Sequence, residues 1–205
     1  MEETHFKNQA KFLKKKVNEF SASILCIDNN GLGRGLTDEL VQEIDENPPY
    51  GVVNDSRYDI YKKPNSVPLV FLVSSNSRET KNDNIINQFM TTIANHDLQI
   101  LKSESSARGF IKEKDPYDMA EKLLPYIQTD RLIDEIMNLE YVQKGTTTTI
   151  KQVSRKIQKD RYSALAYGLY YIYLEEIKNK NKRKKNDDST KNYIAVKKPK
   201  YKVFS

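Results

Sequence analysis

The spacing of apolar residues in the first part of the chain predicts a helix, a strand and a second helix. In residues 6–20, apolar side chains recur every three or four positions with lysines between them, which is typical of an amphipathic helix. Residues 24–27 form an unbroken apolar run that ends at Asp28, which favours a strand buried on both faces of a sheet. A second helix is expected at residues 37–44, capped by Thr37 and stopped by the prolines that follow.

The remainder of the chain continues to alternate between apolar runs and helical periods. Further strands are expected at residues 50–54, 68–74 and 98–101, and further helices at 83–94, 103–140 and 157–177. Pro116 and Pro125 are expected to break the helix that contains them, and Gly145 to begin a polar turn that leads into a brief strand. Strands that alternate with helices predict an α/β fold, with a mixed sheet flanked by helices.

The composition of the chain changes after residue 178. Residues 179–191 are rich in lysine, asparagine and aspartate and show no apolar period, and residues 193–204 are basic with scattered apolar side chains. Such a segment cannot bury enough apolar surface to fold by itself. The sequence therefore predicts one domain at residues 1–178 and a basic, flexible tail at residues 179–205.

Basic residues exceed acidic ones, which bears on the kind of partner to expect. The chain has 34 lysines and arginines against 28 aspartates and glutamates, a formal net charge of +6, and much of the excess lies in residues 14–16 and 178–202. A basic protein attracts polyanions, and phosphate contacts give affinity without sequence preference. The alternative interpretation is a solvated lysine surface and a disordered arm.

The sparse cysteine and histidine content limits the metal sites that the chain can build. Cys26 is the only cysteine, which excludes a disulfide framework and cysteine-based metal sites, and only two histidines are present. A bound metal would therefore need carboxylate ligands, which favour magnesium, manganese or calcium. We expect no membrane partner and no secretory signal, because apolar runs of the required length are missing from the sequence.

The first candidate for chemistry is the segment that leads from the apolar run into the second helix. Asp28 lies where α/β proteins place their sites, at the carboxyl end of a buried strand. Gly31, Gly33 and Gly35 follow at alternate positions, which lets the backbone approach a phosphate or turn tightly into a helix. The segment matches neither the dinucleotide-binding fingerprint nor the P-loop. The alternative interpretation is a glycine-rich strand-to-helix turn with Asp28 as a cap.

The second candidate is the start of the longest helix. Asp160 begins this helix, and Ala164 and Gly168 follow at intervals of four, a small-residue face that permits close packing against a sheet. A carboxylate one turn before that face would lie near the edge of the sheet. The alternative is an aspartate favoured there by the helix dipole. The tyrosines that crowd this helix indicate packing rather than stacking on bases, because duplex DNA exposes no base faces.

Together the two segments resemble the C-terminal nuclease domain of phage terminase large subunits. The pattern Asp-x-x-Gly-x-Gly-x-Gly-x-x-Asp-x-Leu begins at Asp28, and the pattern Asp-x-x-x-Ala-Leu-Ala begins at Asp160. Further matches lie at residues 50–55, 124–126, 135–140 and 159–171. The resemblance covers roughly residues 5–178, and the order and spacing of its motifs carry it.

The resemblance implies a ribonuclease H-like fold with an acidic cluster that binds two divalent cations, Mg²⁺ or Mn²⁺, for the hydrolysis of DNA. By this resemblance, Asp28 and Asp160 match catalytic carboxylates that are also metal ligands. The basic residues expected to contact the DNA backbone are Arg34, which lies beside Asp28 in the glycine-rich turn, and Lys14, Lys15 and Lys16.

The activity implied by the resemblance is that of the endonuclease in a viral DNA-packaging terminase, working on the procapsid in the host cytoplasm. The implied partners are double-stranded DNA, the ATPase part of the terminase, the small terminase subunit and the portal. The chain departs from the family in one respect: the family's first catalytic aspartate lies on a strand before the helix at which this chain begins. The first three strands and that aspartate are therefore expected to be missing.

Because of this departure we expect weak activity, or none, without a partner fragment. One alternative is a catalytically incomplete fragment that only binds DNA or docks to the motor. Another is an unrelated α/β nucleotide-binding protein, which the lack of a full phosphate loop disfavours.

The other acidic residues carry weaker expectations. Asp38 is expected on a helix surface, and Asp55, in a polar turn, is a weaker candidate for a third ligand. Asp130, Asp134 and Glu135 are spaced as a solvated helix face.

Overall fold

The protein is a mixed α/β structure in which helices flank a small parallel sheet. The computed structural model describes residues 5–74, 81–112, 114–145 and 147–187, with residues 182–187 described through their backbone alone. The chain divides into two compact units, Met1–Tyr171 and Ile172–Ser205. The first unit contains the strands, and the described part of the second is the continuation of the last helix. No helix within the described ranges is long and apolar enough to cross a lipid bilayer.

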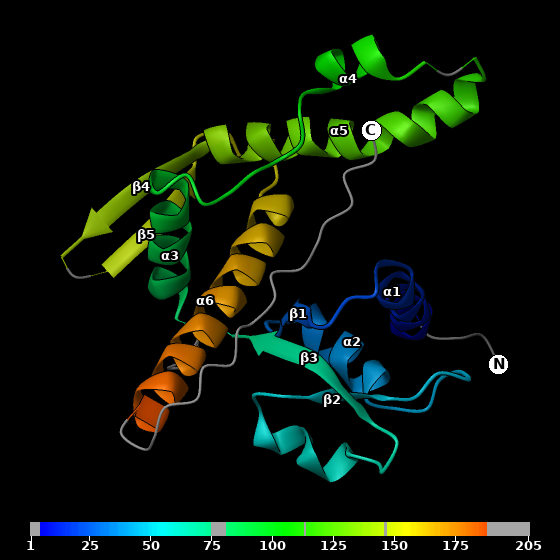
Figure 1. Cartoon of the computed structure of the whole chain (residues 1–205), viewed down its shortest axis with the longest axis vertical. Helices are drawn as coiled ribbons and strands as arrows, with labels where there is room; N and C mark the ends of the chain where they lie inside the picture. Colours follow the sequence, from blue (N-terminus) through cyan, green and yellow to red (C-terminus); the bar gives the residue numbers. More distant parts are fainter. Residues whose placement is uncertain (1–4, 75–80, 113, 146, 188–205) are drawn as a thin grey trace. The chain divides into compact units, whose positions relative to one another are not determined.

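Three parallel strands form the sheet (Figure 1). β1 (Leu25–Asp28) and β2 (Tyr50–Val52) both pair with β3 (Val67–Val73), which lies between them. Asp28 lies opposite Val73, so β1 and β3 end together. The apolar run of β1 predicted a strand buried on both faces, but β1 lies at the edge of the sheet and is only partly buried. The parallel order brings the carboxyl ends of all three strands to one edge.

One face of the sheet is covered by α1 (His5–Phe20) and α2 (Leu32–Leu40), which supply the main apolar core. The core includes Ala10 and Val17 from α1, Leu40 from α2, and Ile27, Val70 and Leu72 from the strands. Burial of these side chains is the main stabilising contribution, at roughly 25 cal/mol for each Å² of apolar surface removed from water. The amphipathic helix predicted at residues 6–20 is confirmed.

The opposite face of the sheet meets aromatic side chains of α6 (Asp160–Asp187). Phe71 and Leu72 are consecutive in β3, so their side chains point to opposite faces. Phe71 packs edge-on against Tyr171, with the ring centroids 5.1 Å apart. In the same way Tyr162 packs against Phe89 of α3 (Asn82–Ala94), at 4.8 Å. The interpretation of these tyrosines as packing residues is therefore confirmed for Tyr162 and Tyr171.

The glycine-rich segment forms the first turn of α2 rather than a loop. Gly31 has a φ of +65° before the helix, a backbone conformation that glycine adopts without strain. A Cβ atom on Gly33 would lie 1.6 Å from the carbonyl oxygen of Asp28, and one on Gly35 would lie 2.9 Å from the Phe6 ring. The helix predicted at residues 37–44 therefore begins earlier, and Thr37 lies buried inside it, donating a hydrogen bond to the Gly33 carbonyl at 2.9 Å.

The small-residue face expected on α6 is not a close-packing face. A Cβ atom on Gly168 would meet no atom within 4 Å among the residues that the structure describes, and Ala164 is exposed. Burial follows Tyr162, Ala166 and Tyr170 instead, which recur at intervals of four. The helix therefore approaches its neighbours through large aromatic side chains rather than through small ones.

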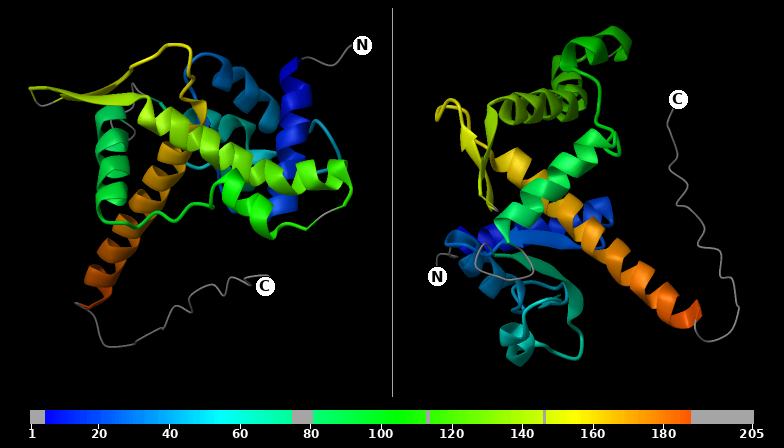
Figure 2. Two further views of the ribbon diagram at one scale, coloured as in Figure 1. Left: turned by 90° about the horizontal axis from the view of Figure 1, so that it is seen from above. Right: turned by 90° about the vertical axis from the view of Figure 1, so that its left-hand side faces the viewer.

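The second half of the first unit holds α4 (Glu104–Phe110), α5 (Pro116–Met137) and a hairpin of β4 (Leu139–Lys144) and β5 (Thr147–Gln152). β4 and β5 pair antiparallel, and α3 lies beside β5 (Figure 2). The turn and strand predicted around Gly145 are confirmed, and Gly145 has a φ of +60°.

Of the other expectations for this region, one is confirmed and two were wrong. Residues 98–101 form no strand. The break expected near Pro116 is confirmed: α4 ends at Phe110, and α5 begins at Pro116 after the capping Asp115, where a missing N–H costs nothing. Pro125 lies inside α5 without ending it, although it has no N–H to donate to the carbonyl of Glu121.

The expected tail overlaps the last helix. α6 continues to Asp187, so residues 179–187 are helical rather than irregular, and residues 188–205 lie outside the described residues. Side chains that make no core can still extend a helix that tertiary packing has already nucleated, because each added residue then gains a hydrogen bond.

Replacing Gly33 by alanine tests the close approach of α2 to β1. The added methyl would overlap the Asp28 carbonyl, so we expect Gly33→Ala to lower the free energy of unfolding by about 3 kcal/mol or more. Gly168→Ala is the matched control, and its helix propensity should raise stability by ~0.5–1 kcal/mol. Urea unfolding followed by circular dichroism measures both, and a parental midpoint for Gly33→Ala would contradict the close approach.

Candidate functional site

The carboxyl edge of the parallel sheet gathers polar side chains from separate parts of the chain. Asp28 ends β1, Asn54 and Asp55 follow β2, and Ser74 follows β3. Parallel strands in α/β proteins place their binding sites at this edge, because the loops that leave the strands meet there. The edge has two polar regions: one around the Asp28 carboxylate and one in a cavity beside it.

The Asp28 carboxylate accepts hydrogen bonds on both oxygens. Oδ1 accepts from the backbone N–H of Asn30 at 2.9 Å and from its side-chain amide at 2.7 Å. Oδ2 accepts from the hydroxyl of Tyr167 on α6 at 3.0 Å. Burial raises the pKa of Tyr167, and the negative charge and hydrogen bond of Asp28 raise it further. The tyrosine therefore stays protonated and acts as a donor at neutral pH.

Asp160 is exposed at the N-terminal end of α6. It precedes Tyr167 by about two turns, ~10 Å along the helix axis. The group on α6 that meets Asp28 is therefore a tyrosine hydroxyl. The role of Asp28 and Asp160 as a pair of catalytic, metal-binding carboxylates stays a prediction.

The N-terminus of α6 is stabilised by Glu135, which reaches it from α5. The Glu135 carboxylate accepts from the backbone N–H groups of Arg161 at 2.8 Å and Tyr162 at 3.0 Å, and from the Arg161 guanidinium at 2.7 Å. Glu135 is only 3% exposed. The prediction that it belongs to a solvated helix face was wrong, because the first N–H groups of a helix attract a buried carboxylate.

A cavity of about 410 Å³ lies at the same carboxyl edge. Its lining residues come from the ends of the strands, α2 and the 3₁₀ helix η1 (Ser56–Tyr61): Asn29, Arg34, Asn54, Asp55, Arg57, Leu72 and Ser74. Asn54 is fixed to the backbone of Leu72, with its amide donating to the carbonyl and accepting from the N–H, both at 2.8 Å. This pair of bonds holds the loop after β2 against β3.

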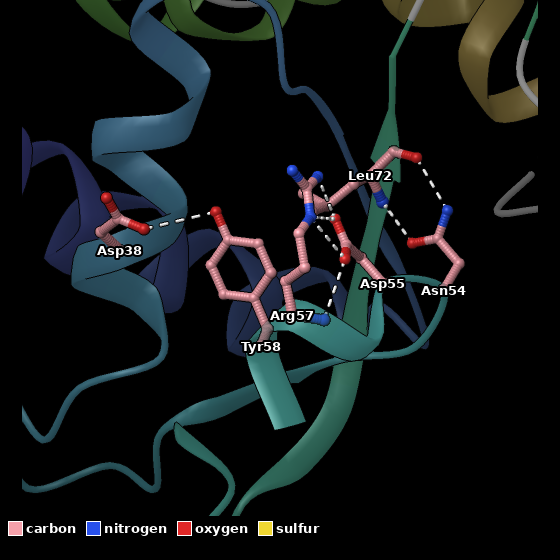
Figure 3. A network of polar contacts seen from close by, with 6 residues as sticks. All are labelled: Asp38, Asn54, Asp55, Arg57, Tyr58 and Leu72. Atoms are coloured by element: carbon pink, nitrogen blue, oxygen red, sulfur yellow. Dashed lines mark hydrogen bonds and ion pairs between the residues drawn. The ribbon is translucent and has the colours of Figure 1, made fainter. Parts of the chain in front are cut away.

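Asp55 and Arg57 form an ion pair at the wall of the cavity (Figure 3). The guanidinium donates to Asp55 through Nε at 3.0 Å and through Nη2 at 2.5 Å, and the Arg57 backbone N–H donates at 3.0 Å. These hydrogen bonds from Arg57 hold the pKa of Asp55 below its usual range, and the charge of Arg34 contributes in the same direction. Asp55, the weaker candidate for a third metal ligand, is therefore already paired with an arginine.

The basic residues predicted to contact DNA lie in different surroundings. Arg34 lines the cavity and its side chain is exposed, and Lys15 is exposed on α1. Lys16 pairs with Glu19 at 2.8 Å. DNA contact by Arg34, Lys15 and Lys16 stays a prediction.

The surroundings of Lys14 correct the prediction that this residue contacts DNA. Its side chain is fully buried and pairs with Asp45 at 2.6 Å, with its Nζ 5.5 Å from the centre of the Tyr50 ring. Lys14 also donates to the carbonyl oxygen of Asn47 at 3.0 Å. Its ammonium is enclosed by these groups, so it does not reach a phosphate. A spacing of four between Lys14 and the buried Ala10 places it on the inner side of α1.

The residues described here do not fit a site for two divalent cations. Such a site needs several oxygen ligands around shared ions. Within the described ranges no group of three or more histidine, cysteine, aspartate or glutamate side chains could hold a metal. Asp28 is hydrogen-bonded to Asn30 and Tyr167, and Asp55 is paired with Arg57.

Three residues at this edge escaped the sequence analysis: Asn29, Arg57 and Tyr167. Arg57 carried a usable signal, because a polar segment directly after a predicted strand belongs to the same edge as Asp28. Asn29, which directly follows the first predicted strand, carried the same signal, whereas Tyr167 carried none, because its role depends on a contact made only in the folded chain.

Comparison with known proteins finds no relative. No protein-family model, no curated protein and no solved structure matches the chain. The resemblance to terminase nucleases therefore rests on the residues and motifs quoted above.

Replacing Asp28 by asparagine tests the contact with Tyr167. The negative charge that opposes ionisation is removed, so we expect the pKa of Tyr167 to fall in Asp28→Asn, while burial keeps it above the ordinary value of 10.0. Ultraviolet titration of each chain against the same chain carrying Tyr167→Phe isolates this hydroxyl. Identical titration curves with and without the Asp28 charge would show that the two groups do not meet.

Proposed function

We propose that this chain binds the phosphate backbone of double-stranded DNA through the carboxyl edge of its parallel sheet, as part of a terminase-type nuclease. The observation that carries the proposal is the position of Arg34 at that edge, on the first turn of α2 and next to the strand that ends at Asp28. Its guanidinium makes no hydrogen bond or ion pair within the part of the chain that the structure describes. The excess of positive charge over the whole chain favours the same partner.

The finer fold assignment, a ribonuclease H-like domain, belongs to the same proposal. It is supported by the order of the parts: a helix, a strand that ends in Asp28, a glycine-rich turn into a helix, and a parallel strand beside the first. The contact of α6 with Asp28 through Tyr167 also agrees with a final helix that lies near the site. In this proposal the further partners are the terminase ATPase part, the small subunit and the portal, met in the host cytoplasm.

A second candidate is the endonuclease activity itself. The observation that favours it is the exposed Asp28 carboxylate at the end of β1, open to a phosphodiester backbone bound at the same edge. Hydrolysis with Mg²⁺ or Mn²⁺ would need carboxylates beyond those that the described residues bring together. By the resemblance, one of these is an aspartate that precedes the first helix of the family pattern. DNA binding is therefore the function that the geometry supports best.

Replacing Arg34 by glutamine tests DNA binding at this edge. We expect Arg34→Gln to weaken binding to a short duplex roughly three- to tenfold at about 0.1 M salt, and to reduce the slope of log affinity against log salt by about 0.9, because one phosphate contact is lost. Lys62→Gln, which removes an exposed charge paired with Asp59, is the matched control. Fluorescence anisotropy over a salt series measures the slopes. Equal slopes for the parent and Arg34→Gln would sink the assignment.

Incubation with supercoiled plasmid and Mn²⁺ tests the endonuclease candidate. If the parent chain nicks the plasmid at a site that contains Asp28, nicking should disappear in Asp28→Asn. Nicking should also fall in Asp160→Asn, because the resemblance assigns Asp160 to the same site. Nicking that persists in Asp28→Asn would exclude this carboxylate. Duplex binding without nicking by the folded parent would assign the chain to binding alone.

A further inference from the structure

The cavity at the carboxyl edge has the size and composition of a binding site for a small anion. Its volume, about 410 Å³, lies within the range of roughly 300–1,000 Å³ that small-molecule sites occupy. Two arginines and one aspartate line it, so its charged side chains leave one positive charge in excess. The three strand ends that surround it are fixed by backbone pairing, which makes its floor part of the sheet rather than a mobile loop.

Arg57 is held in place by its partner and still has donors to offer. Nε and Nη2 donate to Asp55, which leaves the Nη1 amino group without a partner among the described residues. The carboxylate also accepts from the Arg57 backbone N–H, so it fixes both ends of the residue. An arginine oriented in this way loses little freedom when it binds an anion. Asp55 therefore acts as a positioning residue for Arg57.

Arg34 supplies the second positive charge. It lies on the first turn of α2. The residue at the N-terminal cap of this helix, Gly31, has no side chain that could accept a hydrogen bond from the first N–H groups. The partial positive charge of a helix N-terminus favours an anion in its neighbourhood. Arg34 is close enough to Asp55 for its charge to act on that carboxyl group, so the two arginines face one region of the cavity. Their guanidinium groups match the geometry of phosphate oxygens.

Asn29 adds an independent observation at the wall of the cavity. It lines the cavity and is only 6% exposed, and its Oδ1 atom is buried without any hydrogen-bond partner in the described chain. Leaving such an acceptor unsatisfied is unfavourable, and native structures rarely do so without a reason. The other asparagine of the cavity, Asn54, is fully engaged with Leu72. Among the described residues that line the cavity, Asn29 is therefore the one with a buried side-chain acceptor that the protein leaves unpaired.

From this arrangement we infer that the cavity binds a phosphate monoester: Arg34 and Arg57 hold its oxygens, and the ligand lies beside Asn29. A phosphate monoester carries a charge of about −1.5 to −2 near neutral pH, whereas an internal phosphodiester of DNA carries a single negative charge, so a cavity with two arginines favours the monoester. Two sources share this chemistry: the 5′-phosphate at a DNA end and a free nucleotide. The inference rests on the proposed function only for the first source.

Binding of inorganic phosphate to the full chain tests the site without DNA. In ¹H–¹⁵N spectra recorded at constant ionic strength, with chloride as the replaced anion, we expect saturable shifts of the Asn29 amide and of the Arg34 and Arg57 Nε–H signals. Arg34→Gln and Arg57→Gln should each weaken binding about tenfold, because each removes a charge-assisted contact. Lys62→Gln should leave it unchanged. A folded chain that shows no saturable shift overturns the inference.

A substitution at Asn29 separates a ligand-binding role from a structural one. Asn29→Leu removes the unsatisfied oxygen at similar volume, so we expect it to raise the urea unfolding midpoint while it weakens phosphate binding several-fold. If the asparagine instead serves the fold through contacts of its own, the same change lowers the midpoint and leaves the phosphate affinity of the folded chain intact. That second result would remove Asn29 from the site.

Three further probes identify the source of the phosphate. A duplex with a 5′-phosphate that binds more tightly than the same duplex with a 5′-hydroxyl, through Arg57, assigns the site to DNA ends. Deoxyadenosine monophosphate that binds more tightly than either duplex assigns it to free nucleotides. Equal binding of the two duplexes, unaffected by Arg57→Gln, excludes DNA ends from the cavity and leaves the backbone contacts of the proposed function standing.

Discussion

The close approach of α2 to β1 is the constraint on which the rest of the site depends. Gly33 lies against the carbonyl of Asp28 so tightly that no side chain fits between them, and Gly35 lies in the same way against the Phe6 ring of α1. The helix can therefore begin almost directly after the strand. This short connection holds Asp28, Asn29 and Arg34 at one edge of the sheet, where a longer loop would have let them separate.

The strand geometry then divides these neighbours between two environments. Consecutive residues at a strand end point to opposite sides. Asp28 meets Tyr167 on the side of α6, whereas Asn29 lines the cavity together with Leu72 and Arg34. One edge thus presents a carboxylate on one side and a positively charged cavity on the other. A phosphate backbone bound along this edge would meet the arginines first, because they carry the charge that attracts it.

The spacing of apolar residues predicted the helices and strands that depend on neighbouring residues. It failed where contacts between distant parts of the chain determine the structure. The periods of α1, α3 and β3 are strong enough to be read directly. The start of α2 was missed because its glycines look like a loop until the Asp28 carbonyl is placed against them. Glu135 and Lys14 were read as surface charges because their partners lie 26 and 31 positions away, and nothing in the intervening sequence indicates the pairing.

In the described part of the chain, each carboxylate at this edge has its own hydrogen-bonding partners, and the carboxylates share no common partner. Asp55 is neutralised by Arg57, and Asp28 is satisfied by the Asn30 amide and by a tyrosine hydroxyl that burial and the carboxylate itself keep protonated. A shared cation requires the opposite arrangement, in which several carboxylates repel one another until an ion is bound. The guanidinium of Arg34, which lines the same cavity, is engaged by no such pairing among the described residues. Electrostatics at this edge therefore favours an incoming anion, and a phosphate is the anion whose oxygens two facing arginines hold best.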